Sequence, residues 1–204
     1  MARLILLTGF EPFGGERTNP SWEVARRLDG LNMDGATVKA VRLPVGCRRA
    51  ARSVTHAIEE IRPAAILGLG QAAGRPVLSP EKVAINVADE RARRESDGGL
   101  AGTPVIAGGP DAYFSRLPLP EIVRALRAGS IPVGLSLSAG VFACNAAMYA
   151  ALHTLRRRRG VQAGFIHLPY EARQAVRHHT APSMSLEMMT TGIEITLRVI
   201  ARRL

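Results

Sequence analysis

The sequence predicts an α/β protein in which helices cover both faces of a central sheet. Short apolar segments alternate along the chain with segments whose apolar residues recur at helical spacing. Such alternation is typical of parallel strands joined by crossover helices. The 204 residues are 47% hydrophobic, which is enough for one sizeable core. We therefore expect a three-layer α/β/α sandwich with a mixed, mostly parallel, twisted sheet, formed as a single domain over residues 1–204.

The first half of the chain begins with a buried strand over residues 3–10 (RLILLTGF). A helix follows over residues 20–30, because Pro20 suits a first helical position and a glycine ends the segment. The other elements predicted here are a strand over residues 36–45, a helix over 48–62 opening near Cys47, a central strand over 64–70 and an alternating strand over 81–89.

The second half begins with a stretch rich in Gly, Asp, Arg and Pro. It covers residues 90–115 and predicts a long loop, of the kind that is usually functional. The elements predicted after it are a helix over residues 120–129, a strand over 131–138, a helix after Cys144, a strand over 161–170 and a last helix that Ser183 can cap, with Glu187 in its first turns.

The charge is strongly basic, with a formal net charge of +10, and only Lys39 and Lys82 among the 27 basic residues are lysines. A positive balance can indicate a nucleic-acid-binding protein. The arginines, however, are scattered over several helix-like stretches, and aromatic residues make up only 4% of the chain. We interpret them as solvated helix faces and expect no nucleic-acid partner. A polyanion binder remains the alternative, and it predicts salt-sensitive affinity.

The same composition predicts a cytoplasmic protein. No apolar run approaches the roughly 20 residues that span a bilayer, and the first apolar run is too short for a signal peptide. The two cysteines, Cys47 and Cys144, fit no zinc spacing, so we expect free thiols and no membrane or metal.

Three reactive side chains fall at the ends of predicted strands, where α/β sheets collect their catalytic groups. Cys144 lies between a strand and a helix, His167 ends an apolar strand, and Glu81 follows the turn after the third strand. A thiol at a helix N-terminus is exposed to the positive end of the dipole, which favours the nucleophilic thiolate. A nearby imidazole can move its proton, and a carboxylate can orient that imidazole. From the residues alone, inert packing of Cys144 remains the alternative.

Several blocks of the sequence together resemble the pyroglutamyl peptidase I family, also called pyrrolidone-carboxylate peptidases. They are TGFEPFGG, GLGQAAGRPVLSPEKVAINVAD, the ACN block that contains Cys144, GFIHLPY and PSMSLE, and they appear in the family's order from near residue 4 to near residue 200. The resemblance implies a cysteine peptidase that removes N-terminal pyroglutamate through a thioester, with no cofactor and no metal.

Carried over by motif, the resemblance implies Cys144 as nucleophile, His167 as general acid and base, and Glu81 as the orienting carboxylate. It also implies substrate-binding residues around the lactam ring, and these are Phe10, Phe13, Gln71, Phe142 and Arg91. Arg91 is expected near the oxyanion. Family members tend to be homotetramers, which suggests a homo-oligomer here.

The chain departs from the family mainly in the segment RARRESDGG after Glu90, which is unusually basic and puts substrate preference in question. A catalytically silent protein that keeps the pocket and only binds pyroglutamyl peptides is a second hypothesis, from another functional class. The intact Glu81, Cys144 and His167 argue against it.

Overall fold

The structure is a computed structural model that describes residues 3–89 and 102–204. Within these ranges the chain forms a six-stranded sheet with the order β2-β3-β1-β4-β8-β5. The four inner strands are parallel, whereas the edge strands β2 and β5 are antiparallel to their neighbours. The strands of this sheet are β1 (Arg3–Phe10), β2 (Asn32–Met33), β3 (Ala36–Leu43), β4 (Ala65–Gln71), β5 (Ser79–Pro80) and β8 (Gln162–Leu168).

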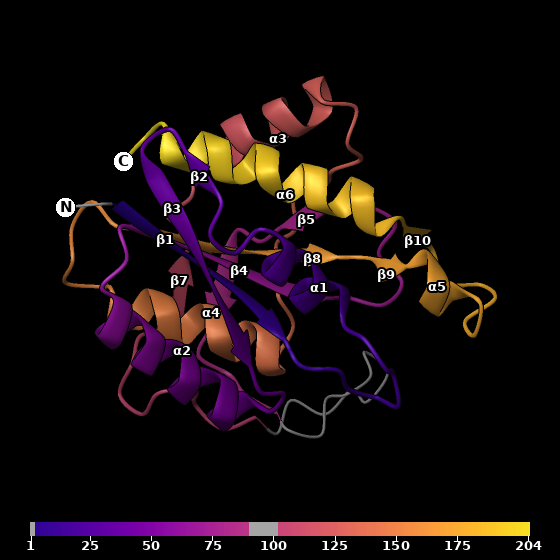
Figure 1. Ribbon diagram of the computed structural model, residues 1–204. Helices are drawn as coiled ribbons and strands as arrows, with labels where there is room; N and C mark the ends of the chain where they lie inside the picture. Colours follow the sequence, from indigo (N-terminus) through magenta and orange to yellow (C-terminus); the bar gives the residue numbers. More distant parts are fainter. Residues whose placement is uncertain (1–2, 90–101) are drawn as a thin grey trace.

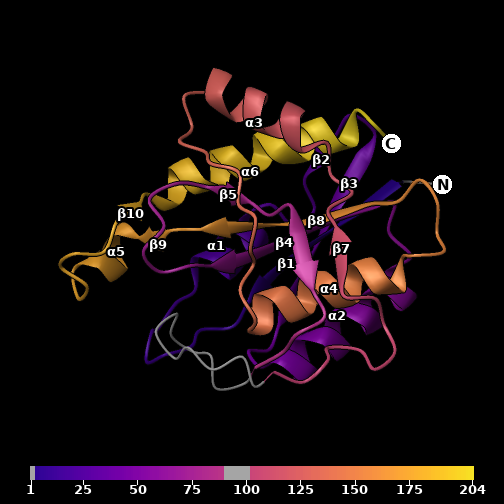
Figure 2. The same ribbon diagram turned by 180° about the vertical axis from the view of Figure 1, so that it is seen from behind.

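Helices cover both faces of this sheet. Their bounds are α1 (Pro20–Arg27), α2 (Cys47–Ile61), α3 (Leu119–Ala128), α4 (Ala143–Thr154), α5 (Ala172–Ala175) and α6 (Leu186–Ala201). Figure 1 shows α3 and α6 on one side of the sheet and α2 and α4 on the other, and Figure 2 shows the same layers from behind. Ile5 and Leu7 face the core that includes α1, α3 and α6, while Leu6 faces the core of α2 and α4. The predicted three-layer α/β/α sandwich is confirmed.

The carboxyl edge of the sheet contains a topological switch point. From β1 the chain crosses to β3 on one side, and from β3 it crosses back to β4 on the other side of β1. Ligands bind at such points in α/β sheets, beyond the carboxyl ends of the strands. Phe10, Gln71 and Leu168 are the last residues of β1, β4 and β8, so these strand ends mark the edge where a site is expected.

Two glycines shape the middle of the sheet. A Cβ atom at Gly68 would lie 2.4 Å from Cδ2 of Phe165, and one at Gly70 would lie 2.8 Å from Cζ of the same ring. The fully buried Phe165 ring therefore packs directly on the backbone of β4 at these two glycines. Its edge packs on His167 at 5.1 Å between ring centroids. The glycines thus let a large aromatic ring support the end of β8.

Several elements match their predictions. β1 spans residues 3–10, α1 begins at Pro20 with Asn19 as its cap, and α2 begins at Cys47. The Asn19 side chain accepts a hydrogen bond from the Ser21 amide at 3.1 Å, so the helix start follows the usual capping chemistry.

The prediction of a strand over residues 131–138 is wrong. This segment runs beside residues 78–82 and makes two isolated bridges, Leu78 to Val133 and Glu81 to Ser136. Pro132 lacks the amide hydrogen that a regular ladder needs. Leu135 and Leu137 are 48% and 70% exposed. The apolar composition of this segment therefore does not mean that its side chains are buried.

Other predicted boundaries also shift. The strand expected over residues 81–89 shortens to β6 (Val83–Ile85), which pairs with β7 (Ala112–Phe114) inside the region predicted as loop. The last helix is capped by Ser185, whose Oγ accepts from the Met188 amide, while Ser183 lies in the short strand β10 (Ser183–Met184) beside β9 (Tyr170–Glu171). Serines two residues apart both fit the capping pattern, so sequence alone does not separate them.

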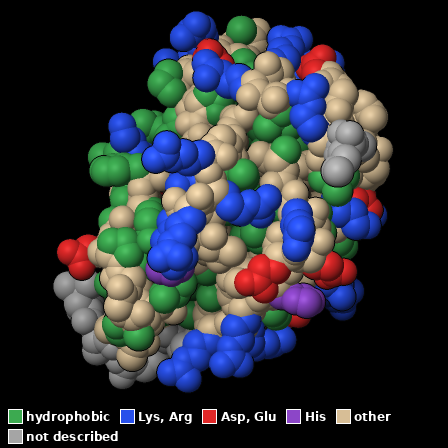
Figure 3. All heavy atoms as spheres, turned by 90° about the vertical axis from the view of Figure 1, so that its left-hand side faces the viewer, with side chains coloured by type: hydrophobic (Ala, Val, Ile, Leu, Met, Phe, Trp, Pro, Cys, Tyr) green, Lys and Arg blue, Asp and Glu red, His purple; other side chains and the backbone are tan. Residues whose placement is uncertain are grey.

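Figure 3 shows the face of the molecule on which both termini lie in Figure 1. Lys and Arg side chains are distributed over this whole face, with hydrophobic and other side chains between them. In the described part of the chain, no helix is long and apolar enough to cross a membrane.

Candidate active site

Cys144 is the second residue of α4, which begins at Ala143, two residues earlier than the predicted start after Cys144. Phe142 occupies the cap position and its side chain makes no capping hydrogen bond. The preceding Gly140 has a φ of +76°, a conformation that favours glycine and lets the chain turn into the helix. The first N–H groups of a helix have no intrahelical acceptor, so they are available around the Cys144 side chain.

The Cys144 sulfur lies over the sheet beside His167. A Cβ atom at Gly70 would be 2.6 Å from Sγ, so the sulfur fills the space above this glycine. Gly70 and His167 are register partners on the parallel strands β4 and β8. Partners in a register point to the same face of a sheet. The thiol and the imidazole therefore share the face covered by α4.

Glu81 approaches His167 from the opposite flank. β5 pairs with β8 antiparallel, with Ser79 opposite His167, and the Glu81 amide donates to the Phe165 carbonyl at 2.9 Å. This pairing places Glu81 Oε1 2.7 Å from His167 Nδ1. An ionised carboxylate only accepts hydrogen bonds, so Nδ1 carries the hydrogen and Nε2 keeps a lone pair. Glu81 is 0% exposed and His167 is 4% exposed, which keeps water away from the pair.

The environment of Cys144 favours the neutral thiol in the unliganded protein. Burial of the sulfur and, to a smaller extent, the Glu81 carboxylate raise the pKa of Cys144 to about 12, against the opposing effects of the Arg75 charge and the cysteine's own amide. The helix N-terminus by itself favours the thiolate. Desolvation outweighs the helix N-terminus because the sulfur is packed against the sheet.

The predicted substrate-binding residues differ in how far they are exposed to solvent. Phe10 is 3% exposed and packs on Phe165 at 6.5 Å between centroids, so it supports the site from the core and does not form an open wall. Phe13 is 36% exposed, and Phe142 is half-buried beside Cys47 and Ala88. Arg91 and the basic segment that follows Glu90 lie outside the described residues.

Gln71 is buried at the end of β4, and a second amide holds it. Its Oε1 accepts from Gln174 Nε2 at 3.1 Å, and the same Nε2 reaches the Thr18 carbonyl at 3.3 Å. The Gln174 Oε1 accepts in turn from the Glu171 amide. Because Gln71 Oε1 is an acceptor in this network, its NH2 group is the donor left for a ligand.

Sequence reasoning missed two residues of this site. Asn145 was expected to open α4, yet its amide bonds the N–H and carbonyl of Ile85 and the Val87 carbonyl, which ties the helix start to β6. Arg75 was not singled out, although it lies only six residues before Glu81. Its Nη1 is 2.8 Å from Glu81 Oε1. The short separation in sequence between this arginine and the candidate carboxylate was the signal that could have indicated the pair.

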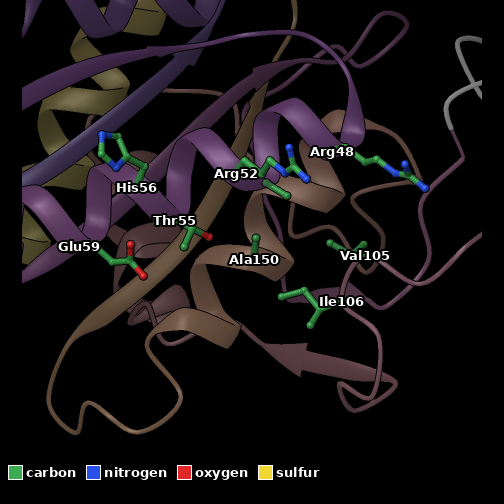
Figure 4. Close-up of a pocket in the computed structure, with 9 residues that line it drawn as sticks. Arg48, Arg52, Thr55, His56, Glu59, Val105, Ile106 and Ala150 are labelled. Carbon is green, nitrogen blue, oxygen red and sulfur yellow. The ribbon is translucent and has the colours of Figure 1, made fainter.

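A separate groove with a cavity volume of about 430 Å³ runs along the outer face of α2 (Figure 4). It is lined by Arg48, Ala51, Arg52, Thr55, His56, Glu59, Val105, Ile106 and Ala150. Neither Glu81, Cys144 nor His167 belongs to this lining, so the groove is distinct from the candidate catalytic group. Among residues 3–89 and 102–204, no group of three or more His, Cys, Asp or Glu is placed to hold a metal ion.

Comparison with known proteins shows the family to which the chain belongs. The chain is 42% identical to the pyrrolidone-carboxylate peptidase of Yersinia pestis (strain Pestoides F) over 198 residues, which cover 97% of this chain and 92% of the relative. The crystal structure of pyroglutamyl peptidase I from Bacillus amyloliquefaciens superposes with a TM-score of 0.90 at 36% identity, covering 98% of this chain and 96% of that one. A mutant pyrrolidone carboxyl peptidase from Pyrococcus furiosus gives a TM-score of 0.91 at 35% identity, covering 98% and 99%. The family model for pyroglutamyl peptidase matches residues 3–203, and the chain belongs to that family.

Proposed function

We propose that this protein is a cysteine peptidase that hydrolyses the bond after an N-terminal pyroglutamyl residue. Family membership supports the substrate class. The observation that carries the chemistry is the row formed by Cys144, His167 and Glu81 across the end of β8. The sulfur lies above the register partner of His167, and Glu81 holds the far side of the imidazole at 2.7 Å.

The first step in this proposal is proton transfer coupled to attack. Because burial raises the pKa of the Cys144 thiol to about 12, the sulfur needs a base before it can act as a nucleophile. The lone pair of His167 Nε2 accepts the thiol proton as Sγ bonds to the carbonyl carbon of the scissile amide. The imidazolium that forms is stabilised by the buried Glu81 carboxylate at Nδ1.

The second step is collapse of the tetrahedral intermediate. Amide N–H groups at the start of α4 stabilise the oxyanion, since they have no intrahelical acceptors. His167 returns its proton to the leaving amine as the C–N bond breaks, which leaves a thioester on Cys144. Water, deprotonated by His167, then attacks the thioester, releases pyroglutamate and restores the thiol.

Specificity for the lactam rests on a few polar groups among apolar ones. Phe13 and Phe142 offer apolar surface, and the NH2 group of Gln71 can donate to the ring carbonyl. A proline ring lacks that carbonyl and would leave the donor unpaired. The cost is about 1–3 kcal/mol for each unpaired buried group, which corresponds to roughly 5- to 150-fold in rate. We therefore expect prolyl amides to be poor substrates.

The test is hydrolysis of a pyroglutamyl amide with a chromogenic leaving group. We expect turnover by the reduced protein, a large loss in Cys144→Ala and slower cleavage of the matching prolyl amide. Full activity in Cys144→Ala would refute the nucleophile. Binding of the pyroglutamyl amide without any product from the unmodified protein would instead favour the silent binding protein.

We also propose a homo-oligomer located in the cytoplasm. Three large apolar side chains, Phe114, Leu135 and Leu137, are 48–70% exposed, and contact between copies would cover such surface. Both cysteines are thiols, which suits a reducing compartment. Light scattering after gel filtration tests the assembly, and a purely monomeric species at micromolar concentration would contradict it.

A further inference from the structure

Arg75 connects two parts of the candidate site that are far apart in sequence. Its Nη1 donates to Glu81 Oε1 at 2.8 Å, and its Nη2 donates to the Ser138 carbonyl at 3.0 Å. The arginine side chain is 23% exposed, while the glutamate side chain is 0% exposed. One guanidinium therefore touches both the carboxylate and the segment that leads to Cys144.

The bond to Glu81 fixes the orientation of its carboxylate. Oε1 accepts from both Arg75 and His167, whereas the buried Oε2 has no hydrogen-bond partner within the described residues. A rotation that moved Oε1 away from His167 would break both bonds. A buried carboxylate is also costly without a paired charge, and Arg75 is the guanidinium that supplies one.

The bond to Ser138 fixes the segment before the nucleophile. The Ser138 Oγ accepts from the Gly140 amide at 3.2 Å, and Gly140 adopts the positive φ that turns the chain toward α4. The Ser138 carbonyl also accepts from the Ser136 hydroxyl at 3.2 Å. Arg75 thus holds one end of a short hydrogen-bonded turn whose other end leads into the nucleophile helix.

Arg75 also influences the thiol electrostatically. Burial and the Glu81 charge raise the pKa of Cys144, and the positive charge of Arg75 lowers it. Without this charge, the effect of Glu81 on the pKa of Cys144 would no longer be offset, and the thiol would be harder to deprotonate.

We propose that Arg75 is a positioning residue of the reaction, which holds Glu81 Oε1 against His167 and anchors the turn before Cys144 through Ser138. The inference rests on the proposed peptidase function. Arg75 acts through Glu81 and the turn, and it needs both arms of its guanidinium to do so. Lysine keeps the charge but presents a single nitrogen, so it replaces only part of this role.

The experiment compares Arg75→Gln, Arg75→Lys and the control Arg52→Gln on a pyroglutamyl amide. Arg52 is an exposed arginine of the α2 groove, so its replacement removes the same charge away from the site. We expect kcat of Arg75→Gln to fall about 10- to 100-fold, the range of a lost charged hydrogen bond, with KM little changed. Arg75→Lys should recover part of kcat, and Arg52→Gln should match the unmodified protein.

A double-mutant cycle with Glu81→Gln separates positioning from general stability. If Arg75 acts through Glu81, its replacement costs much less once Glu81 is already neutral, so the effects are not additive. Alkylation of Cys144 by iodoacetamide at neutral pH should also be slower in Arg75→Gln than in Arg52→Gln. A role limited to folding would lower the melting temperature and leave the cycle additive.

The outcomes are distinguishable. Normal kcat in a folded Arg75→Gln protein, or fully additive effects with Glu81→Gln, would overturn the role of Arg75 while leaving the peptidase intact. Absence of turnover by the unmodified protein would overturn the proposed function itself.

Discussion

Replacing Gly70 with alanine perturbs the nucleophile without altering any reactive group. The new methyl group would lie 2.6 Å from Cys144 Sγ, whereas ordinary contacts begin at 3.4 Å. Since β4 is a central strand, we expect the sulfur to move by the difference, about 0.8 Å. A misplacement of about 1 Å costs roughly 100-fold in rate, so we expect kcat/KM to fall by about that factor.

The same methyl group meets the Phe165 ring at 2.8 Å, so the variant also loses stability. Gly68→Ala provides the control, because its methyl group would lie 2.4 Å from Phe165 and has no close contact with the sulfur. Thermal unfolding and kcat/KM on a pyroglutamyl amide are measured for both variants. Both should melt at lower temperature, but the larger kinetic loss should belong to Gly70→Ala.

Slower alkylation of the thiol in Gly70→Ala would show that the sulfur itself has been displaced. The reasoning is refuted if folded Gly70→Ala keeps the kcat/KM of the unmodified protein. It is equally refuted if Gly68→Ala loses as much activity, because the effect would then come from the ring.

Three further predictions concern stability and pH. Asn145→Ala removes three hydrogen bonds and should lower the free energy of unfolding by about 3 kcal/mol, at about 1 kcal/mol per bond, measured in urea; a loss below about 1 kcal/mol would contradict the anchoring role. Because burial raises the pKa of the Cys144 thiol to about 12, its alkylation should accelerate with pH without levelling in the neutral range, and a plateau there would contradict the buried thiol. Burial alone would raise the pKa of Glu16, but hydrogen bonds from His178 and Gln174 and the charges of Arg177 and His178 leave it below its ordinary value. The stability from Glu16 is then present above that value and lost as pH falls through the lower pKa, so melting curves of Glu16→Gln and the unmodified protein should converge in acid and differ at neutral pH.

The fold could be predicted largely from local patterns. β1 and α2 have the periodicities of a buried strand and an amphipathic helix, and those patterns are decided within a few residues. The segment over residues 131–138 has the composition of a strand but lacks the pairing. Its irregular ladder with residues 78–82 depends on contacts between distant parts of the chain, which composition does not report.

The residues of the candidate site and their positions at strand ends could be predicted from the sequence. Their contacts with one another could not. Cys144, His167 and Glu81 all follow from the rule that catalytic groups collect at the carboxyl ends of strands, and the family resemblance implies the same three residues. Arg75 and Asn145 escaped because their partners are a carboxylate and backbone groups brought near by folding. The raised pKa of the thiol also depends on burial, which the sequence does not show. The position at a helix N-terminus, taken alone, favours the thiolate.

The most direct test of the proposed mechanism is rapid quenching of the reaction with a pyroglutamyl ester, followed by peptide mapping in a mass spectrometer. The account predicts a pyroglutamyl group bound as a thioester to the peptide that contains Cys144, and it predicts no adduct in Cys144→Ala. Turnover by Cys144→Ala at the rate of the unmodified protein, or an acyl group on another residue during normal turnover, would contradict it.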